Sequence, residues 1–466
     1  MSALTGKHVL VLGLGESGLA MARWCALRGA RVRVADSRVT PPGVDALRED
    51  APLAEIITGA FADEVLDGVD LVALSPGLDP RVGVAAAARG RGLPVTGEMS
   101  LLAQALDELG VRGQSRILAI TGTNGKTTTT ALTAALASAA GLDAVAAGNI
   151  SPAALDVLME RLELGLALPQ CWVLELSSFQ IETMAGLDPD AATVLNVTDD
   201  HLDRYADLAD YAATKAAIFQ GEGVQVLNRD DARVEAMVRP GRHAIRFGTG
   251  APTGQGDYGL ADAEGRAWLV RGSTRLLALD ELPLAGRHNA ANALAALALC
   301  EGGLGIEPQA LIDGLKAFRG LPHRVELVAE RADGVRYYDD SKGTNVGATV
   351  AALDGLSDPV VLIAGGDGKG QDFSPLAGVL ARHARAVVLI GRDARLIEAA
   401  VTGCGVRLEH AADLDAAVAR ANALAQAGDV VLLSPACASL DMFRNYAHRA
   451  EVFVTAVRRL PEVSPR

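Results

Sequence analysis

The chain has 466 residues, half of them hydrophobic and 21% charged, which is enough for about three folded domains and argues against a disordered polymer. Its 43 lysines and arginines against 57 aspartates and glutamates leave a net charge of −14, which argues against non-specific binding to nucleic acid. The five cysteines form no CxxC pair, so neither a disulfide framework nor a zinc knuckle is indicated, and a reducing compartment fits.

Signals for export or membrane insertion are missing from the sequence. The first twelve residues hold one lysine and a short apolar run, with no small-residue cleavage site behind it. The longest uncharged run, residues 127–142, opens with four threonines and is too short to cross a bilayer. We therefore expect a cytoplasmic protein without a membrane span.

The first segment has the pattern of a Rossmann-like domain. Residues 8–12, 31–35 and 71–74 are predicted strands, and residues 17–28 a helix. The run 13–18 fits G-x-G-x-x-G directly after a strand, and Asp36 ends the next strand. Three interpretations stay open at this point: a nicotinamide dinucleotide pocket, glycines that serve only helix–strand packing, and a pocket for another nucleotide diphosphate.

A second segment begins after the polar stretch 110–115, which interrupts the helical pattern. The buried strand predicted at 117–120 leads into Thr-Gly-Thr-Asn-Gly-Lys-Thr-Thr at 121–128, where Lys126 and Thr127 suit a phosphate and Mg²⁺. Ile120 stands where the general P-loop pattern has its first glycine. The alternative is a surface loop, but the strand–loop–helix context favours nucleotide binding.

Further along this segment, two candidate metal ligands follow predicted strands. The strands are expected at 172–176, 192–197 and 224–227, and a hairpin at 267–270 and 274–278. Glu175 lies near the end of the first strand and His201 follows the second, at the edge where open α/β sheets bind ligands. The alternatives are a hydrogen-bonded structural histidine and, for Lys215, an ordinary solvated lysine.

The third segment repeats the alternation of strands and helices. Residues 320–324 stop a helix and mark its start, and strands are predicted at 360–364, 386–390 and 430–433. The sequence therefore predicts an α/β protein of three domains, with boundaries at 1–112, 113–320 and 321–466.

Motifs in all three segments resemble those of the Mur ligases of peptidoglycan synthesis. In chain order they are residues 122–127, 175–180, 196–205, 286–292, 322–324, 340–342 and 365–369. Within that family, residues 36–37, 148–150, 340–345 and 434–441 are most similar to the member that adds D-glutamate.

The resemblance implies an ATP-dependent amide ligase that adds D-glutamate to UDP-N-acetylmuramoyl-L-alanine through an acyl phosphate, giving ADP and phosphate. It implies a Rossmann-like N-terminal domain for the UDP substrate, a central P-loop-type ATPase domain, and a Rossmann-like C-terminal domain. The last would bind the incoming amino acid and close over ATP. The resemblance therefore assigns the first glycine loop to the UDP substrate and not to a nicotinamide cofactor. No nucleic-acid partner is implied, and a monomer is expected.

The resemblance also implies roles for individual residues. For catalysis the residues are Lys126, Glu175, His201 and Lys215. Two Mg²⁺ sites would use Thr127, Glu175, His201 and Lys215, the last as a carbamylated lysine. ATP would contact Gly122, Thr123, Asn124, Gly125, Lys126, Thr127, Thr128, Asn289, Asn292, Arg324, Asp340 and Lys342. The UDP substrate and D-glutamate would contact Gly15, Ser17, Asp36, Ser37, Asn149, Ser177, Thr344, Lys369, Ser439 and Tyr446.

Three positions depart from the family's usual residues: the Glu16-Ser17 pair, Gly343 and Tyr446. Four rival functions are to be weighed. A sister Mur ligase would add another amino acid, and a folylpolyglutamate synthetase would leave the N-terminal domain unexplained. An NAD-dependent oxidoreductase would leave Lys126 unused, and a non-catalytic regulator would bind ATP without releasing phosphate.

Overall fold

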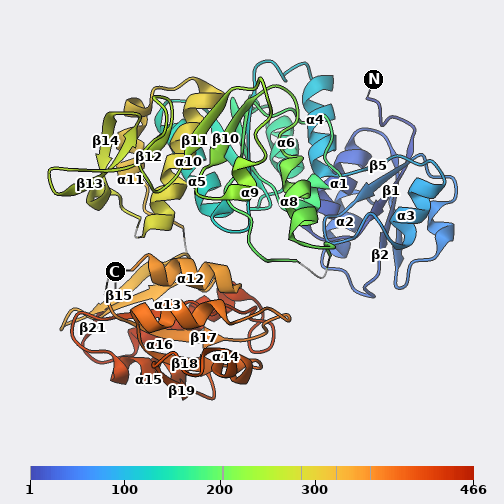
Figure 1. The fold of residues 1–466 in the computed structure, drawn as a ribbon. Helices are drawn as coiled ribbons and strands as arrows, with labels where there is room; N and C mark the ends of the chain where they lie inside the picture. Colours follow the sequence, from blue (N-terminus) through green and yellow to red (C-terminus); the bar gives the residue numbers. More distant parts are fainter. Residues whose placement is uncertain (1, 202–203, 285, 322, 357, 466) are drawn as a thin grey trace.

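A computed structural model describes residues 2–201, 204–284, 286–321, 323–356 and 358–465 as three α/β units in chain order (Figure 1). Leu202, Asp203 and Pro322, which belong to the predicted motifs, lie outside the described residues. Among the residues that are described, none of the helices is both long and apolar enough for a bilayer crossing.

The N-terminal unit is built on a five-stranded parallel sheet of order β3-β2-β1-β4-β5. Its strands are β1 (His8–Leu12), β2 (Arg31–Asp36), β3 (Glu55–Thr58), β4 (Leu71–Leu74) and β5 (Val95–Thr96). Its helices are α1 (Glu16–Leu27), α2 (Val44–Asp50), the 3₁₀ turn η1 (Asp63–Leu66), α3 (Gly83–Gly90) and α4 (Glu98–Glu108). The strand order reverses at β1, so the first glycine loop lies at the switch point where such sheets bind ligands.

The central unit has a six-stranded parallel sheet of order β11-β10-β9-β6-β8-β7. Its strands are β6 (Arg116–Thr121), β7 (Ala144–Gly148), β8 (Cys171–Glu175), β9 (Ala191–Val194), β10 (Val224–Asn228) and β11 (Ala244–Phe247). Its helices are α5 (Lys126–Ala139), α6 (Ala154–Glu163), α7 (Ser178–Ile181), α8 (Leu208–Ala216), α9 (Ala232–Glu235), α10 (Arg287–Leu304) and α11 (Ile312–Ala317), with 3₁₀ turns η2 (Leu279–Glu281) and η3 (Pro308–Leu311).

The predicted hairpin is part of a small antiparallel sheet of three strands. These are β12 (Tyr258–Ala263), β13 (Arg266–Arg271) and β14 (Thr274–Ala278), and the first of them was not predicted. Tyr258 of this sheet hydrogen-bonds to Glu301 of α10, 2.5 Å between the two oxygens, so the sheet lies against the central helix.

The C-terminal unit has a seven-stranded mixed sheet of order β19-β18-β17-β20-β16-β15-β21. Its strands are β15 (Glu326–Arg331), β16 (Arg336–Asp339), β17 (Val360–Gly365), β18 (Ala384–Ile390), β19 (Arg407–His410), β20 (Val430–Leu433) and β21 (Val463–Pro465). Its helices are α12 (Val346–Asp354), α13 (Pro375–His383), α14 (Ala394–Val401), α15 (Leu414–Leu424) and α16 (Tyr446–Arg458). Strand β15 pairs antiparallel with both β16 and β21, and the other pairings are parallel.

The hydrophobic cores distinguish the C-terminal unit from the other two. One cluster of buried residues is continuous from the N-terminal unit, for example Met99, into the central sheet at Trp172. The two clusters of the C-terminal unit contain residues of that unit alone. In Figure 1 the C-terminal unit lies apart from the other two, with α12 facing the central unit. The first two units are therefore joined by shared apolar packing, and the third is not.

Candidate functional site

The glycine loop between β6 and α5 has the geometry of a phosphate cradle. Gly122 and Gly125 both adopt positive φ, 152° and 83°. A Cβ on Gly125 would lie 2.5 Å from the side-chain oxygen of Asn292, so no larger residue fits there. Asn196 accepts hydrogen bonds from the loop amides of Thr123 and Asn124, at 2.9 and 2.8 Å. A fixed glycine loop that opens a helix is an arrangement that binds phosphate groups. We call residues 122–127, where the resemblance places ATP, the ATP loop.

Two lysines, the half-buried Lys126 and the buried Lys215, meet at one carbonyl of the ATP loop. Lys126 and Lys215 each donate a hydrogen bond to the oxygen of Gly122, both at 2.9 Å. Lys215 is completely buried, and its amine lies 4.4 Å from the centre of the Tyr211 ring. Burial, followed by the nearby charge of Lys126, lowers the pKa of Lys215 well below its ordinary value. The prediction that Lys215 belongs to a functional cluster therefore fits its place, since a surface lysine has none of these contacts.

Glu175 ends strand β8 with one carboxylate oxygen unpartnered. Its side chain is 1% exposed, and Oε1 accepts a hydrogen bond from the Asn149 amide at 2.7 Å. Oε2 is shielded from solvent and has no hydrogen-bond partner among the described residues. A buried anionic oxygen without a donor is costly unless a cation or donor binds to it. The donor set thus fits a hard divalent cation, which prefers oxygen ligands.

His201 lies in the loop after β9, beside an aromatic group. Its ring centre is 4.7 Å from that of Phe179 and 6.4 Å from that of Tyr211. Its Nε2 is 3.6 Å from the Asp200 carboxylate, and the side chain is 42% exposed. The predicted strand at 192–197 ends at residue 194, so His201 is carried by a longer loop than the sequence indicated.

Helix α10 presents two asparagines to the ATP loop. Asn289 and Asn292 are both buried, and the Asn292 amide donates to the Asn289 oxygen at 3.1 Å. Because the Asn292 oxygen faces Gly125, the first turn of α10 and the ATP loop are in direct contact. This arrangement supports the predicted nucleotide contacts of both asparagines.

The C-terminal unit reaches the ATP loop through Arg324. Its guanidinium donates to the hydroxyl of Thr127 at 2.5 Å, across a sequence separation of 197 residues. Burial lowers the pKa of Arg324, and Glu175 and Asp340 oppose that shift. Asp340 accepts a hydrogen bond from Ser434 at 2.7 Å, and burial raises its pKa to about 7. Of the three nucleotide contacts predicted from this unit, Arg324 therefore touches the ATP loop, and Asp340 acts on the charge of Arg324.

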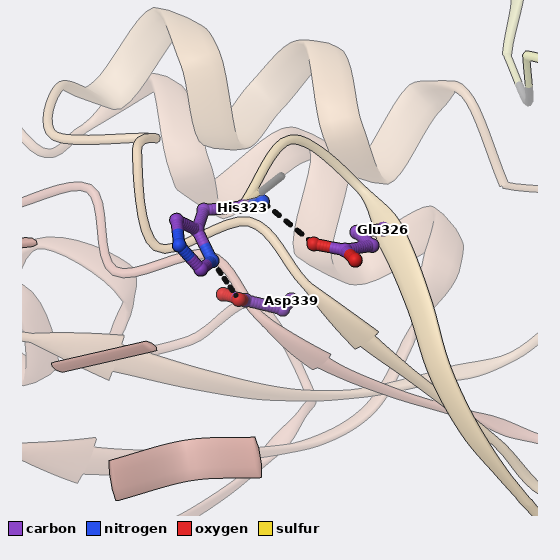
Figure 2. Close-up of side chains that lie close together, drawn as sticks. All are labelled: His323, Glu326 and Asp339. Carbon is purple, nitrogen blue, oxygen red and sulfur yellow. Dashed lines mark hydrogen bonds and ion pairs between the residues drawn. The ribbon is translucent and has the colours of Figure 1, made fainter. Parts of the chain in front are cut away.

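Arg324 is preceded by a histidine that is fixed on two sides (Figure 2). His323 donates its backbone amide to Glu326 at 2.8 Å, and its Nδ1 lies 2.7 Å from the carboxylate of Asp339. These three side chains are close enough for a metal site by distance alone. Their polar atoms are engaged with one another, and the network sets the backbone that leads into Arg324. Asp339 was not predicted from the sequence, because its only signal is its position at a strand end.

The residues predicted to hold the amino acid gather in the C-terminal unit. Tyr446, one of them, lies beside Lys342, which is a predicted nucleotide contact: the amine of Lys342 is 3.8 Å from the centre of the Tyr446 ring. Asp367 and Ala438 form an isolated bridge, which brings the loops carrying Lys369 and Ser439 side by side. Thr344 follows Lys342 in the same loop and donates its amide to the carbonyl of Lys342 at 2.9 Å. Among the described residues, no hydrogen bond joins Lys369 or Ser439 to the ATP loop directly.

In the N-terminal unit, the carboxylate of Asp36 accepts hydrogen bonds from other groups of the chain. Its Oδ2 accepts from the amide of Leu14 and from Arg38, and its Oδ1 accepts from the Arg38 amide and Nε. The Arg38 side chain holds the pKa of Asp36 down at about 2. These four hydrogen bonds fix the carboxylate at the end of β2, beside the first glycine loop. Sequence reasoning missed Arg38, because nothing in its spacing marks it.

The remaining predicted substrate residues lie on separate elements. Gly15 and the part-buried Ser17 belong to the first glycine loop and the start of α1, whereas Ser37 is exposed. Ser177 caps α7 by accepting from the amide of Gln180 at 3.2 Å. The unusual Glu16 accepts from the hydroxyl of Ser151 at 2.7 Å, so it bridges the first two units.

Comparison with known families matches three domain models in chain order. Residues 7–97 match the MurD-like N-terminal domain of Mur ligases, residues 120–300 the Mur ligase middle domain, and residues 323–437 the Mur ligase glutamate ligase domain.

Two curated relatives are similar over almost the entire chain. A UDP-N-acetylmuramoylalanine--D-glutamate ligase of Aromatoleum aromaticum is 80% identical, covering 99% of both chains. A protein of the same name from Dechloromonas aromatica is 58% identical, covering 98% of this chain and 99% of its own.

Solved structures share the fold at low sequence identity. The UDP-N-acetylmuramate-alanine ligase MurC of Thermotoga maritima has a TM-score of 0.60 at 20% identity, covering 97% of this chain and 99% of its own. MurF of Acinetobacter baumannii has a TM-score of 0.58 at 18% identity, covering 93% and 89%.

Proposed function

The chain belongs to the Mur ligase family, and from this premise we propose that it joins D-glutamate to UDP-N-acetylmuramoyl-L-alanine at the expense of ATP. Relatives that carry this activity in their names align with nearly every residue of the chain. The products are ADP, phosphate and the lengthened UDP precursor of peptidoglycan. The N-terminal domain (1–112) binds the UDP substrate, the central domain (113–320) binds ATP and Mg²⁺, and the C-terminal domain (321–466) supplies D-glutamate.

The observation that carries the proposal is the meeting of four groups at the ATP loop. Lys126 and Thr127 open helix α5, the unpartnered oxygen of Glu175 lies at the end of β8, and Arg324 reaches Thr127 from the C-terminal domain. A dehydrogenase has no use for this cluster. A phosphoryl transfer requires it, because cations must offset the repulsion between the two reacting anions.

The residues at the ATP loop have roles in a reaction of two steps, formation of an acyl phosphate and its attack by an amine. The substrate carboxylate attacks the γ-phosphorus of ATP, the bond to the bridging oxygen breaks, and ADP leaves with that bond's electron pair. Lys126 and Arg324 stabilise the charge that moves during this step. The amine of D-glutamate attacks the acyl phosphate and loses a proton, and the tetrahedral intermediate expels phosphate. Asn149, held by Glu175, is placed to orient the substrate near the reacting carboxylate.

The residues present fit the Mg²⁺ that the family uses. Thr127, Glu175 and His201 would hold two ions, with the unpartnered oxygen of Glu175 as the clearest ligand. When bound, Mg²⁺ neutralises phosphate charge and orients the phosphate groups.

We further propose that Lys215 is carbamylated. Its neutral amine would add to CO₂, releasing one proton and forming a carbamate, which turns a cation into an anionic metal ligand. The burial of Lys215 and its neighbour Lys126 support this proposal, because both favour the neutral amine that reacts.

The remaining assignments follow the resemblance. Nucleotide contacts are proposed for Gly122, Thr123, Asn124, Gly125, Thr128, Asn289, Asn292, Asp340 and Lys342. UDP-substrate contacts are proposed for Gly15, Ser17, Asp36, Ser37, Asn149 and Ser177, and D-glutamate contacts for Thr344, Lys369, Ser439 and Tyr446.

The deciding experiment follows phosphate and its oxygen atoms. Phosphate release should require ATP, UDP-N-acetylmuramoyl-L-alanine and D-glutamate together, and ¹⁸O placed in the alanine carboxylate should appear in the phosphate. Formation of AMP and pyrophosphate, or unlabelled phosphate, would overturn the mechanism. Replacing D-glutamate by other amino acids separates this activity from that of a sister ligase. ATP binding without phosphate release would instead indicate a regulator.

We also propose that the protein is a cytoplasmic monomer. Cell fractionation and the mass measured by light scattering test the two parts of this proposal separately.

A further inference from the structure

Helix α12 presents a row of small residues to the central domain. Gly347, Ala351 and Gly355 follow one another at intervals of four along or just beyond the helix, so they share one face. Val346 and Leu353 are buried in the core of the C-terminal domain, on the side of α12 that packs against its own sheet. The small residues are only half-buried, and Figure 1 shows α12 on the surface that faces the central domain.

The N-terminal end of this face touches the ATP loop. A Cβ on Gly347 would lie 2.9 Å from the side-chain nitrogen of Asn124 and 3.6 Å from the hydroxyl of Thr198. The backbone of α12 therefore approaches the ATP loop as closely as glycine permits.

The other end of the face meets the start of α10 through a histidine. A Cβ on Gly355 would lie 2.9 Å from two atoms of the His288 ring and 3.1 Å from the Cα of Gly286. A Cβ on Gly286 would in turn lie 2.9 Å from the Cα of Gly355. The imidazole of His288 thus lies at a point where two glycines, one from each domain, come together.

His288 also makes a polar contact between the two domains. Its ring hydrogen-bonds to the backbone carbonyl of Ala351 in α12. Its Nδ1 is shielded from solvent and has no hydrogen-bond partner among the described residues, which leaves Nε2 as the donor. A side chain of the central domain therefore recognises the middle of α12.

The first turn of α10 connects this contact to the nucleotide site. Asn289 follows His288 directly, and Asn292 lies one turn further on with its oxygen against Gly125 of the ATP loop. Ala290 and the residues of α10 from Ala293 to Cys300 are buried in the central core, so the helix holds both contacts in fixed relation. A shift of the ATP loop is therefore transmitted to the surface that receives α12.

We propose that His288 is a positioning residue that couples the ATP loop to the docking of the C-terminal domain, through its contact with Ala351 and Gly355 of α12. The proposal rests on the proposed function, because docking brings Arg324 to the ATP loop. His288 does not touch the reacting atoms. It raises the share of molecules in which both domains contribute to one site, and ligands then bind with higher apparent affinity.

The first test compares two substitutions of His288. His288→Leu removes the hydrogen bond, and His288→Gln keeps a donor near the Nε2 position. We expect His288→Leu to raise the KM for ATP and for D-glutamate about tenfold and to leave kcat within about twofold, a typical size for coupling between sites. His288→Gln should recover most of this loss. His410→Ala, at an exposed histidine of β19, is the matched control and should behave like the wild type.

The second test approaches the contact from the other domain. Gly355 has φ −81°, so Gly355→Ala introduces no backbone strain and changes the contacts of this position with His288 and with the backbone of Gly286. We expect the same increase in KM. The double variant His288→Ala, Gly355→Ala should be no worse than either single variant, because both remove one interaction. Gly378→Ala is the matched glycine control, since its nearest neighbour is a flexible Arg382 atom 3.8 Å away.

X-ray scattering in solution gives a readout that does not require ligase activity. With Mg²⁺ and ATP present, His288→Leu should have a larger radius of gyration than the wild type, and His288→Gln should not. Equal radii, unchanged KM values, or a loss of kcat at constant KM would each overturn the proposal. If the wild type releases no phosphate, the proposed function fails, and the scattering comparison still decides the role of His288.

Discussion

At the scale of single residues, Lys126 is the side chain whose loss should cost the most. It donates hydrogen bonds to the carbonyls of Gly122 and Thr123, and burial lowers its pKa, so its charge is held inside the ATP loop. We expect Lys126→Ala to lower kcat/KM about 10²–10³-fold while the protein stays folded, since a fixed electrostatic contact to the transition state is lost. Phosphate release and circular dichroism measure the two effects.

The control for this variant is Lys316→Ala. Lys316 is an exposed lysine of α11 that pairs with Glu281, and its removal should leave turnover unchanged. Near-normal turnover in Lys126→Ala would contradict the role given to the ATP loop.

Lys215 provides a second residue-level prediction. We expect Lys215→Ala to lose activity and to regain part of it when acetate or another small carboxylate is added, because the added anion takes the place of the carbamate. Chloride at the same ionic strength is the control. Normal turnover in Lys215→Ala without any additive would rule out the carbamate.

The sequence predicted some site residues and not others for a physical reason. The ATP loop is local, because strand, glycines, Lys126 and Thr127 follow one another, and its place could be predicted. Arg324 meets Thr127 only after two domains have docked, and the resemblance rather than any local pattern indicated that contact. His288 lies in the motif 286–292, but its contact with Gly355 is set by the packing of two domains and could not be predicted. Arg38 carried no motif signal, although its partner Asp36 is only two residues away.

At the scale of elements, the junction of β6 and α5 depends on Gly125. Gly125→Ala places a Cβ in the left-handed region and 2.5 Å from the Asn292 oxygen, so the ATP loop must shift. We expect weaker ATP binding, by about tenfold or more, in a titration with a fluorescent ATP analogue. Gly141, just beyond the other end of α5, has φ +91° but no atom within 4 Å. Gly141→Ala should therefore cost stability and leave ATP affinity unchanged.

Three strands that the sequence did not predict, β7, β15 and β16, lack a continuous run of large apolar residues. β7 is Ala-Val-Ala-Ala-Gly, and β15 and β16 contain glutamate, arginine and tyrosine rather than continuous apolar runs. The buried parallel strands β6, β17 and β20 are almost entirely apolar and were predicted to within one or two residues. Strands at or near sheet edges bury fewer side chains, so their sequences are less constrained and less recognisable.

At the scale of the whole molecule, a buried carboxyl joins the first two domains. Glu98 of α4 accepts from the amides of Ala154 and Leu155 at the start of α6, and it also hydrogen-bonds to Ser17. Burial raises its pKa to about 7 from an ordinary 4.5. The native state therefore binds one more proton than the unfolded chain between these two pH values.

The sign of the pH effect follows from this raised pKa. The contribution of Glu98 to the free energy of unfolding is fully present below pH 4.5 and falls by about 3 kcal/mol as the pH rises to 7. Glu98→Gln removes this pH dependence. The free energy of unfolding of the variant, relative to that of the wild type, should therefore be higher at pH 8 than at pH 5.

The matched variant is Glu108→Gln at the other end of α4. Burial opposes ionisation there, but hydrogen bonds from Ala3, Ser2 and Arg28 outweigh it and lower the pKa of Glu108. A lowered pKa changes stability only below about pH 4.5, so Glu108→Gln should have nearly the same stability relative to the wild type at pH 5 and at pH 8, as measured by thermal unfolding. A pH-dependent shift in Glu108→Gln as large as that in Glu98→Gln would contradict the buried role of Glu98.

The pairing of β15 with β21 imposes an order on biosynthesis. Residues 326–331 leave the ribosome early among those of their domain, yet one edge of that strand stays without a neighbour until residues 463–465 have been translated. The first two sheets contain no such late partner and can close while the remaining chain is still being made. A nascent polypeptide stalled before residue 463 would carry an open strand edge, a surface that chaperones are suited to cover and that other stalled chains can join.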